Sequence, residues 1–273
     1  MEPPRTTCIA QATHDEEIVM PRPLPLLTLA LTGMALTAIA LSTTACSRTD
    51  ESPAADEVAR STQDWATLRD FTEIDATGPD NVAVTIGSGF AVKADGDARA
   101  VADLDIRVKD GKLVIGRKSK GDWSWGRKDG DKGATVHVTM PAIAAAALTG
   151  AGDFDLDKAQ GDRLDLSLTG AGDFRIGTVA VKTLSADITG AGSVKIAGAA
   201  DTAKMSITGA GDINAEALKV GTADLSILGA GDIDIASDGK VAISIMGPGD
   251  VKVKGKAQCT TSGVGPGEAR CAP

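Results

Sequence analysis

A glycine motif that recurs along the second half of the chain constrains the fold more than any other feature. It has the form Gly-Ala-Gly-Asp, with serine at the last position of one copy, proline at the second position of the last two copies and glutamate at the end of the final copy. Successive copies lie 18 to 20 residues apart and begin at Gly150, Gly170, Gly190, Gly209, Gly229, Gly247 and Gly265. A fixed period of this length is typical of proteins that stack one small structural unit many times.

Apolar and polar residues alternate on both sides of each motif. Leu164, Leu166 and Leu168 precede one copy, and Phe174 and Ile176 follow it. A period of two predicts strands with one buried face. The apolar residues do not follow helical spacing, and glycine is too frequent for helix interiors. We therefore expect an all-β fold.

Two short strands cannot bury their own apolar face, so successive units must stack on one another. Stacking pairs each strand with its equivalent in the next unit and produces a parallel β-helix, or β-solenoid, with coils of about 20 residues. We predict a right-handed wind, because parallel crossovers take that hand almost without exception. The glycines then form a corner in every coil, where positive φ or close backbone approach favours glycine.

The region from Trp65 to the first motif predicts shorter and less regular strands. Short alternating or apolar runs lie at residues 71–75, 82–86, 104–108 and 113–115. Asp110-Gly111 between the last two runs indicates a β-hairpin. We expect this region to form an irregular β cap, since an end coil would otherwise present an open sheet edge. The predicted solenoid domain, including its cap, spans residues 65–273.

The amino-terminal residues predict export. Residues 24–41 are apolar, follow Arg22 and lead through small residues to Cys46, which is the arrangement of a secretory signal. This segment, residues 1–46 with Met20 as an alternative start, resembles a bacterial lipobox. The resemblance implies cleavage before Cys46 and a diacylglycerol on that cysteine; an uncleaved transmembrane helix is the alternative. Residues 47–64 are rich in Ser, Asp, Glu, Ala and Pro, which indicates a flexible tether.

The chain as a whole resembles the head GIN domain family, which is described as the heads of autotransporter adhesins. The resemblance covers about residues 70–270 and rests on the opening at 71–74, the run at 111–115 and the repeated glycine motif. It implies a surface or periplasmic β-helix with an adhesive role, and it implies no catalytic residues. With Ser47 after the lipobox cysteine, we expect an outer-membrane lipoprotein of the cell envelope that carries an adhesin-like binding or structural head.

The acidic residues that end the glycine motifs are the first candidate site. Stacking would place Asp212, Asp232 and Asp250 in one file, with a spacing of about 4.8 Å between coils. Two charges at that distance repel by about 0.9 kcal/mol in water. Because this cost is small, we expect the carboxylates to accept backbone hydrogen bonds at the turns; a divalent cation bridging the file is the alternative. We expect no cofactor.

Residues 117–133 are the second candidate site. Trp123 and Trp125 lie there near Arg127 and Lys128, and this combination suits stacking on sugars or contact with anionic surfaces. The alternative is a solvated loop whose tryptophans pack on the cap. The expected partners are thus a membrane, through the lipid anchor, and a surface glycan or another envelope protein. A net charge of −9 argues against nucleic acid as a partner.

Few cysteine and histidine residues are available for chemistry. Cys259 and Cys271 flank the last coil and can close a disulfide in an oxidising compartment; two free thiols are the alternative. Cys8 and His14 precede the predicted cleavage site, and His137 stands alone in an alternating run. We therefore predict that the protein is not an enzyme. The competing hypothesis is a carbohydrate-active envelope enzyme, of polysaccharide lyase or hydrolase type, built on a β-helix.

Overall fold

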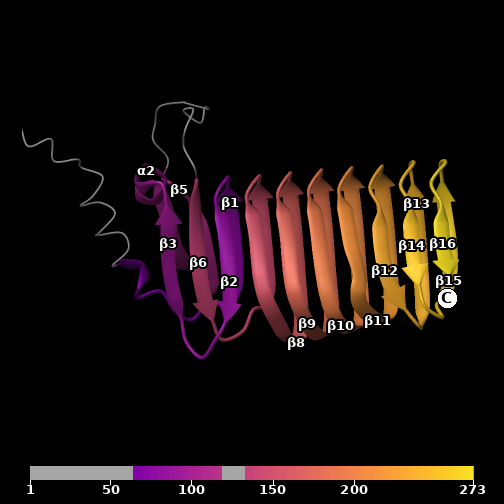
Figure 1. Cartoon of the computed structure of the whole chain (residues 1–273), viewed down its shortest axis with the longest axis horizontal. Coiled ribbons are helices and arrows are strands. Elements are labelled where there is room, and N and C mark those ends of the chain that lie inside the picture. Colours follow the sequence, from indigo (N-terminus) through magenta and orange to yellow (C-terminus); the bar gives the residue numbers. More distant parts are fainter. Residues whose placement is uncertain (1–63, 119–132, 273) are drawn as a thin grey trace, which may run out of the picture. The chain divides into compact units, whose positions relative to one another are not determined.

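The computed structural model describes residues 64–118 and 133–272. Figure 1 shows them as strands stacked side by side along one axis, which confirms the predicted β-solenoid. Besides one short helix, α2 (Ala98–Ala102), the named elements are strands. They are β1 (Glu73–Gly78), β2 (Asn81–Ile86), β3 (Ala91–Gly96), β4 (Leu104–Lys109), β5 (Lys112–Arg117), β6 (Ala134–Met140), β7 (Ala145–Gly150), β8 (Asp153–Gly170), β9 (Asp173–Gly190), β10 (Ser193–Gly209), β11 (Asp212–Gly229), β12 (Ile233–Ser237), β13 (Lys240–Met246), β14 (Val251–Lys254), β15 (Gln258–Val264) and β16 (Ala269–Ala272).

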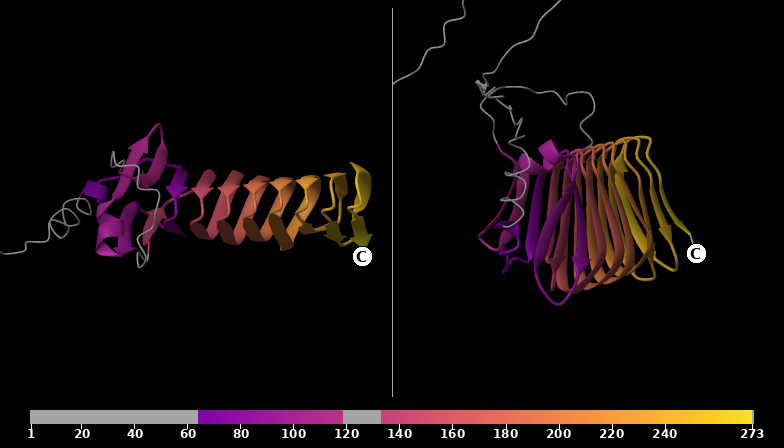
Figure 2. Two further views of the ribbon diagram at one scale, coloured as in Figure 1. Left: turned by 90° about the horizontal axis from the view of Figure 1, so that it is seen from above. Right: turned by 60° about the vertical axis from the view of Figure 1, so that its left-hand side comes forward.

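Each coil contributes strand segments to two parallel rows, one before and one after the glycine corner (Figure 2). The register follows the repeat, since Asp153 pairs with Asp173 and Gly170 pairs with Gly190. In the middle coils the chain bends without leaving the β conformation, so β8, β9 and β11 are each 18 residues long. The two short strands expected for each coil are therefore merged with those of the next coil into longer, bent strands.

At the amino-terminal end, the order in which the coils stack differs from their order in the sequence. β1 pairs in parallel with both β5 and β7, and β2 pairs in parallel with both β6 and β8. The first coil in the sequence is consequently sandwiched between a coil made later, from β5 and β6, and the glycine repeats. The region predicted as an irregular cap thus contains regular coils, and its first coil has stacking partners on both sides.

Antiparallel strands and a helix finish this end. β3 pairs with β6 and β4 pairs with β5 in antiparallel fashion, and Asp110 and Gly111, both with positive φ, form the predicted hairpin turn. Helix α2 lies beside them (Figure 1) and buries Ala100, Val101 and Ala102. The cap prediction did not include this helix, although Asp97 accepts hydrogen bonds from the amides of Arg99 and Ala100 and is a typical N-cap residue.

The core is a narrow stack of aliphatic layers with three buried phenylalanines, Phe71, Phe154 and Phe174. Phe154 and Phe174 lie in register with ring centroids 4.9 Å apart. The alternation is confirmed in detail, since Met205 and Ile207 are buried while Ser206 between them is half-buried. Every methylene removed from water here contributes about 0.8 kcal/mol, so the inward rows supply most of the stabilisation.

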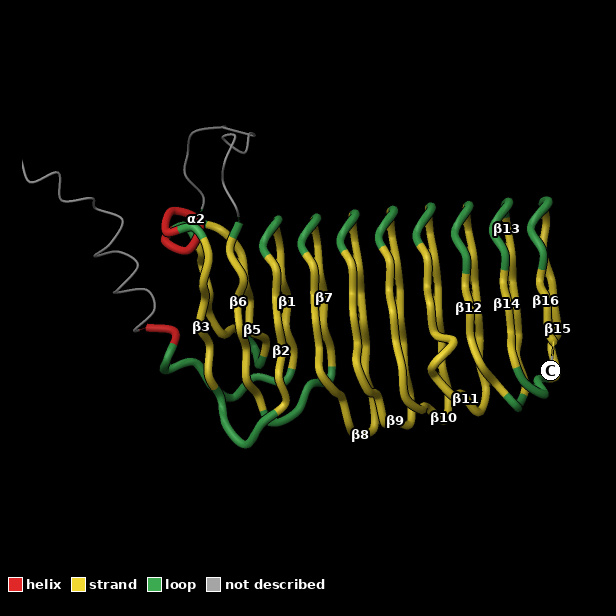
Figure 3. The backbone as a smooth tube through the Cα atoms, in the orientation of Figure 1, coloured by secondary structure: helices red, strands yellow, loops and turns green. Residues whose placement is uncertain are grey.

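The glycine corners line up along one edge of the solenoid, where Figure 3 draws them as loops between strands. The first glycine of each motif has positive φ, for example 126° at Gly170 and 137° at Gly229. A Cβ on the second glycine would lie 2.1 Å from the carbonyl oxygen of the preceding coil at Gly172 and 1.9 Å at Gly231. Both functions predicted for glycine are therefore present. The first glycine of each motif combines positive φ with close approach, since a Cβ on Gly229 would lie 2.0 Å from the carbonyl oxygen of Gly209, and the second glycine shows close approach alone.

One outward row changes character along the solenoid. Next to the glycine corner it holds threonine in the earlier coils, as at Thr189 and Thr208. In the last three coils it holds Leu228, Met246 and Val264, which lie in register. These three are the exposed large hydrophobic side chains of the described residues.

Candidate functional site

The acidic residues of the motifs do form a file, and its oxygens bind the backbone of the neighbouring coil. Oδ1 of Asp212 accepts the amide of Asp232 at 3.0 Å, and Oδ1 of Asp232 accepts the amide of Asp250 at 2.8 Å. Asp250 in turn accepts the amide of Glu268 at 2.9 Å. Each side chain therefore caps the corner of the next coil, so the expected backbone hydrogen bonds at the turns run between neighbouring coils.

This hydrogen bonding bears on the candidate metal site. One oxygen of Asp212, Asp232 and Asp250 accepts a hydrogen bond from an amide of the next coil, which reduces the capacity of each carboxylate to bind a cation. Among the residues that the structure describes, no group of three or more His, Cys, Asp or Glu side chains is arranged to hold a metal.

The first coil carries a copy of the motif that sequence analysis missed. Gly78-Pro79-Asp80-Asn81 takes the place of a Gly-Pro-Gly-Asp corner, since Gly78 pairs with Gly150. The Asn81 side chain accepts the amide of Asp153 at 3.0 Å, as the aspartates do in later coils. The sequence signal for this copy was the Gly78-Pro79 pair followed by Asn81, whose side-chain oxygen can replace that of the motif aspartate as a hydrogen-bond acceptor.

Asp80 replaces the second glycine of this copy and joins two distant segments. Its buried carboxylate accepts two hydrogen bonds from the Arg117 guanidinium, at 2.7 and 2.8 Å, and one from the amide of Ala134 at 2.9 Å. Arg117 ends β5 and Ala134 begins β6, so Asp80 holds the end of one strand beside the start of the other. The candidate ligand residues Trp123, Trp125, Arg127 and Lys128 belong to the intervening segment and lie outside the described residues.

The predicted lipidation site, Cys46, also lies outside the described residues. Within the described part of the chain, no helix is long and apolar enough to cross a membrane. His137 is exposed on β6, where its Nε2 lies 3.0 Å from Asp95.

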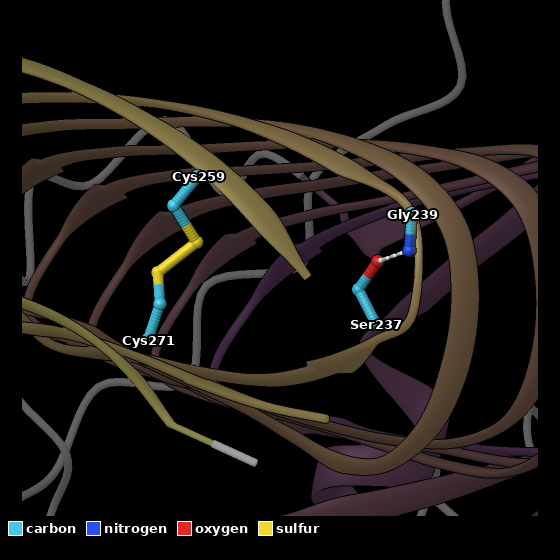
Figure 4. Close-up of a disulfide and its surroundings, with 4 residues drawn as sticks. All are labelled: Ser237, Gly239, Cys259 and Cys271. Carbon is cyan, nitrogen blue, oxygen red and sulfur yellow. Dashed lines mark hydrogen bonds between the residues drawn. A yellow bond between two sulfur atoms is a disulfide. The ribbon is translucent and has the colours of Figure 1, made fainter. Parts of the chain in front are cut away.

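Cys259 and Cys271 are joined in a disulfide across the last coil (Figure 4). Their Cα atoms lie 6.6 Å apart, on β15 and β16. They occupy inward positions, because Cys259 pairs with Val241 and Cys271 pairs with Val253. The disulfide thus closes the last coil where the preceding coils pack aliphatic side chains.

A groove crosses the row of strands that follows the glycine corner. It has a volume of about 510 Å³ and runs over β2, β8, β9, β10 and β11. Pockets of this size are typical of small-molecule sites. Its lining includes small residues, Ala83, Gly177, Ala197 and Ala217, with the aliphatic residues Leu156, Ile176 and Ile196 in the strands beneath them.

The groove forms where each coil bends. Ala197 pairs with Ala217 after a register shift that inserts an extra residue into β11, and such a bulge bends a strand. A Cβ on Gly177 would lie 2.4 Å from the carbonyl oxygen of Asp157, so that position excludes a side chain. The groove could not be predicted from the sequence, because its charged and small lining residues are ordinary outward residues of five separate coils.

The charged residues of the groove are distributed unevenly. Asp155 and Asp157 lie on β8, toward one end, whereas Arg175 on β9 and Lys195 on β10 follow in the next coils. Asp157 accepts hydrogen bonds from the amides of Ile86 and Lys158. The groove therefore has an acidic part and a basic part.

Arg175 is already surrounded by carboxylates. It lies 3.0 Å from Asp153, 3.0 Å from Asp173 and 3.7 Å from Asp155. The hydrogen bond to Asp153, and then the negative charge around it, raise the pKa of the Arg175 guanidinium above its ordinary value. Lys195 is exposed and makes no ion pair within the described residues.

Comparison with known proteins agrees with this architecture. The family model described as "Putative auto-transporter adhesin, head GIN domain" matches residues 70–257. The chain belongs to the head GIN domain family. The match spans the amino-terminal coils and most of the glycine repeats, so these coils are part of the head GIN domain itself.

Three solved structures share the head GIN fold of this chain. A "putative adhesin" from Bacteroides fragilis is 24% identical, with a TM-score of 0.70 over 76% of this chain and 94% of that chain. A "putative lipid binding protein" from Parabacteroides distasonis is 19% identical, with a TM-score of 0.61 over 76% and 94% of the two chains. A "putative adhesin" from Parabacteroides merdae is 20% identical, with a TM-score of 0.59 over 74% and 93%. No curated protein matches the chain.

Proposed function

We propose that this protein is an envelope-anchored lipoprotein whose head GIN solenoid is a binding head without catalytic activity. The observation that carries the binding role is the groove, a preformed concave site of about 510 Å³ on a rigid stack of coils. Membership of a family described as adhesin heads supports the same role. The solved neighbour described as lipid binding is a further reason to include apolar ligands among those tested.

The anchoring part of the proposal rests on Cys46. It follows an apolar segment and small residues, as lipidated cysteines of bacterial lipoproteins do. Replacing Cys46 with Ala should leave export intact and release the protein from the outer-membrane fraction. Fractionation of cells carrying the variant measures this, and a correctly exported variant that stays in the membrane would refute the anchor.

The carboxylates of the groove already have partners within the protein, which argues against a catalytic role. Asp157 is held by two backbone amides, and Asp155 lies beside Arg175. Neither is arranged as a free acid–base pair of the kind that glycoside cleavage requires. If the protein is instead a carbohydrate-active enzyme, incubating it with anionic polysaccharides should produce new reducing ends.

Two measurements distinguish the binding head from the enzyme. Binding of envelope glycans, proteins or amphiphiles to the purified protein, without product formation, supports the head. Release of reducing ends that is lost in Asp155→Asn would establish the enzyme instead. Ser206→Asn, an outward substitution on the other row of strands, is the matched control for that variant.

A further inference from the structure

We infer that the groove binds a single-chain anionic amphiphile, a long-chain fatty acid, with its carboxylate at Lys195 and its alkyl chain along the groove toward β2. This inference rests on the proposed binding function and names the ligand class. Four features of the groove lead to it: its length, its lining, its unpaired cation and its acidic end.

The direction and length of the groove suit an extended chain. It runs across five neighbouring strands, which at about 4.8 Å per strand spans about 19 Å. From Lys195 on β10 to Ala83 on β2 there are three strand spacings, or about 14 Å. An extended alkyl chain advances about 1.25 Å per carbon–carbon bond, so about 12 or 13 carbons cover this distance and longer chains reach its open end.

The lining favours aliphatic ligands over sugars. Gly177, Ala197 and Ala217 are small outward residues of successive coils and leave a shallow channel over the strands, with Ala83 at its β2 end. Sugar-binding sites use aromatic faces for stacking, and none of the described residues that line this groove is aromatic. Burying an alkyl chain here contributes about 0.8 kcal/mol for each methylene removed from water.

Lys195 is the cation available to a ligand. Arg175, its neighbour in register, has Asp153, Asp155 and Asp173 around it. On the other side, Lys195 pairs in register with Asn214, whose amide is a second hydrogen-bond donor for a carboxylate. The two side chains together form an anion-binding end within the basic part of the groove.

The acidic residues fix the orientation of the ligand. Asp155 and Asp157 lie on β8, between Lys195 and β2. A carboxylate placed at that end would be repelled by both, whereas an uncharged tail can lie between them over the backbone of Leu156, whose side chain is buried in the core. The fatty acid therefore lies with its head toward β10 and β11.

The test uses the Cys46→Ala chain, which lacks the lipid anchor, and isothermal titration with dodecanoate, dodecanol and dodecyltrimethylammonium. We expect dodecanoate to bind and the cation to bind at least tenfold more weakly. Lys195→Met keeps the aliphatic stem and removes the charge. It should weaken the binding of dodecanoate about tenfold or more, as loss of a charge-assisted hydrogen bond does, and leave the affinity for dodecanol unchanged.

Two further variants test the location. Ala197→Leu fills the channel and should abolish binding of both dodecanoate and dodecanol, with an unchanged urea midpoint showing that the coil is intact; Ala217→Leu replaces it if that midpoint falls. Lys204→Met is the matched control, because Lys204 is an exposed lysine of the same strand, β10, on the other row. It should bind dodecanoate like the parent protein.

The outcomes separate this inference from the proposed function. Failure of dodecanoate to bind, or equal binding by the parent and Lys195→Met, overturns the fatty-acid assignment. If a glycan or an envelope protein then binds and Ala197→Leu blocks it, the binding head stands with another ligand. If Ala197→Leu weakens the binding of no ligand of any class, the groove is not a binding site, and both the fatty-acid assignment and the proposed binding function are wrong.

Discussion

At the scale of single residues, each coil is locked to the next by the corner glycines and by one side-chain oxygen. The glycine carbonyls are approached so closely that a methyl group has no room, as the 1.9 Å contact of a Cβ at Gly231 illustrates. The aspartates then accept hydrogen bonds from corner amides that have no partner in the β-sheet. This matters because unpaired backbone donors are costly when partly buried. Repetition of the motif is thus explained by contacts between coils.

Gly231→Ala should be severely destabilising, by about 3 kcal/mol or more, because the new methyl group must push two coils apart. Gly89→Ala is the matched control, since no atom lies within 4 Å of its Cβ and its φ is not positive. It should change the free energy of unfolding by less than about 1 kcal/mol, in the stabilising direction if at all. Urea unfolding measures both, and similar midpoints would contradict the steric explanation.

Asp232→Ala should cost about 1 kcal/mol, as lost side-chain caps do, because the amide of Asp250 loses its acceptor at 2.8 Å. Asp232→Asn should keep most of the stability, since the amide oxygen still accepts that bond. The two variants are compared by thermal melting.

Millimolar calcium should shift the melting midpoint of the parent protein by no more than about a degree or two, because one oxygen of each carboxylate in the file is already bound to an amide. A large rise in the midpoint with calcium, abolished in Asp232→Asn, would make the file a metal site.

At the scale of the strand, alternation determines which face is buried, and the neighbouring coils determine what an outward substitution costs. Met205 and Ile207 face the core, whereas Ser206 lies in an outward row between Asp187 and Ser226. An outward position in a solenoid has two in-register neighbours at about 4.8 Å. Its tolerance therefore depends on residues about 20 positions away in either direction.

Ile207→Asp should be severely destabilising, by about 4 kcal/mol or more, because it buries an unpaired carboxylate. Ser206→Asp should cost no more than about 1 kcal/mol, most of it repulsion from Asp187 in the neighbouring coil. Urea midpoints that fall equally would mean that the strand register is wrong. Added salt should recover part of the Ser206→Asp loss and none of the Ile207→Asp loss.

At the scale of the whole solenoid, the two ends are closed by different means. Helix α2 and two antiparallel strands cover the amino-terminal end, and the first coil of the chain lies inside the stack. At the other end, the Cys259–Cys271 disulfide closes a coil whose residues are mostly exposed. Because each coil contacts only its neighbours, stability is local, and an end coil can open without the rest.

Replacing both Cys259 and Cys271 with Ala should remove about 3 kcal/mol of loop-closure stabilisation from the last coil. The effect should be confined to that end. Hydrogen exchange should accelerate in β15 and β16, slightly in β13 and β14, and not in β8 or β9. Loss of protection along the entire solenoid would show that the last coil is essential for the cooperative fold.

Much of the fold could be predicted from the sequence. The period of the glycine motif determined a stacked β fold, and the alternation determined the inward set, including Ile207. Both are local properties, because a strand has only two faces and a corner of this kind accepts only glycine. The motif copy at Gly78 and helix α2 escaped prediction, although each left a signal, a Gly-Pro corner and an N-cap aspartate.

Tertiary structure alone decided the order of the amino-terminal coils, the Asp80–Arg117 pair and the groove. Asp80 and Arg117 are far apart in the sequence, and the spacing of a repeat does not tell whether a coil made later stacks before or after an earlier one. The groove depends on neighbouring strands that bend at the same level of the solenoid. Stacking places Lys195 beside Asn214 and brings small residues of neighbouring coils together. The sequence alone therefore determined how each coil is built and what faces its core. Which outward side chains share a surface was decided only when the coils stacked.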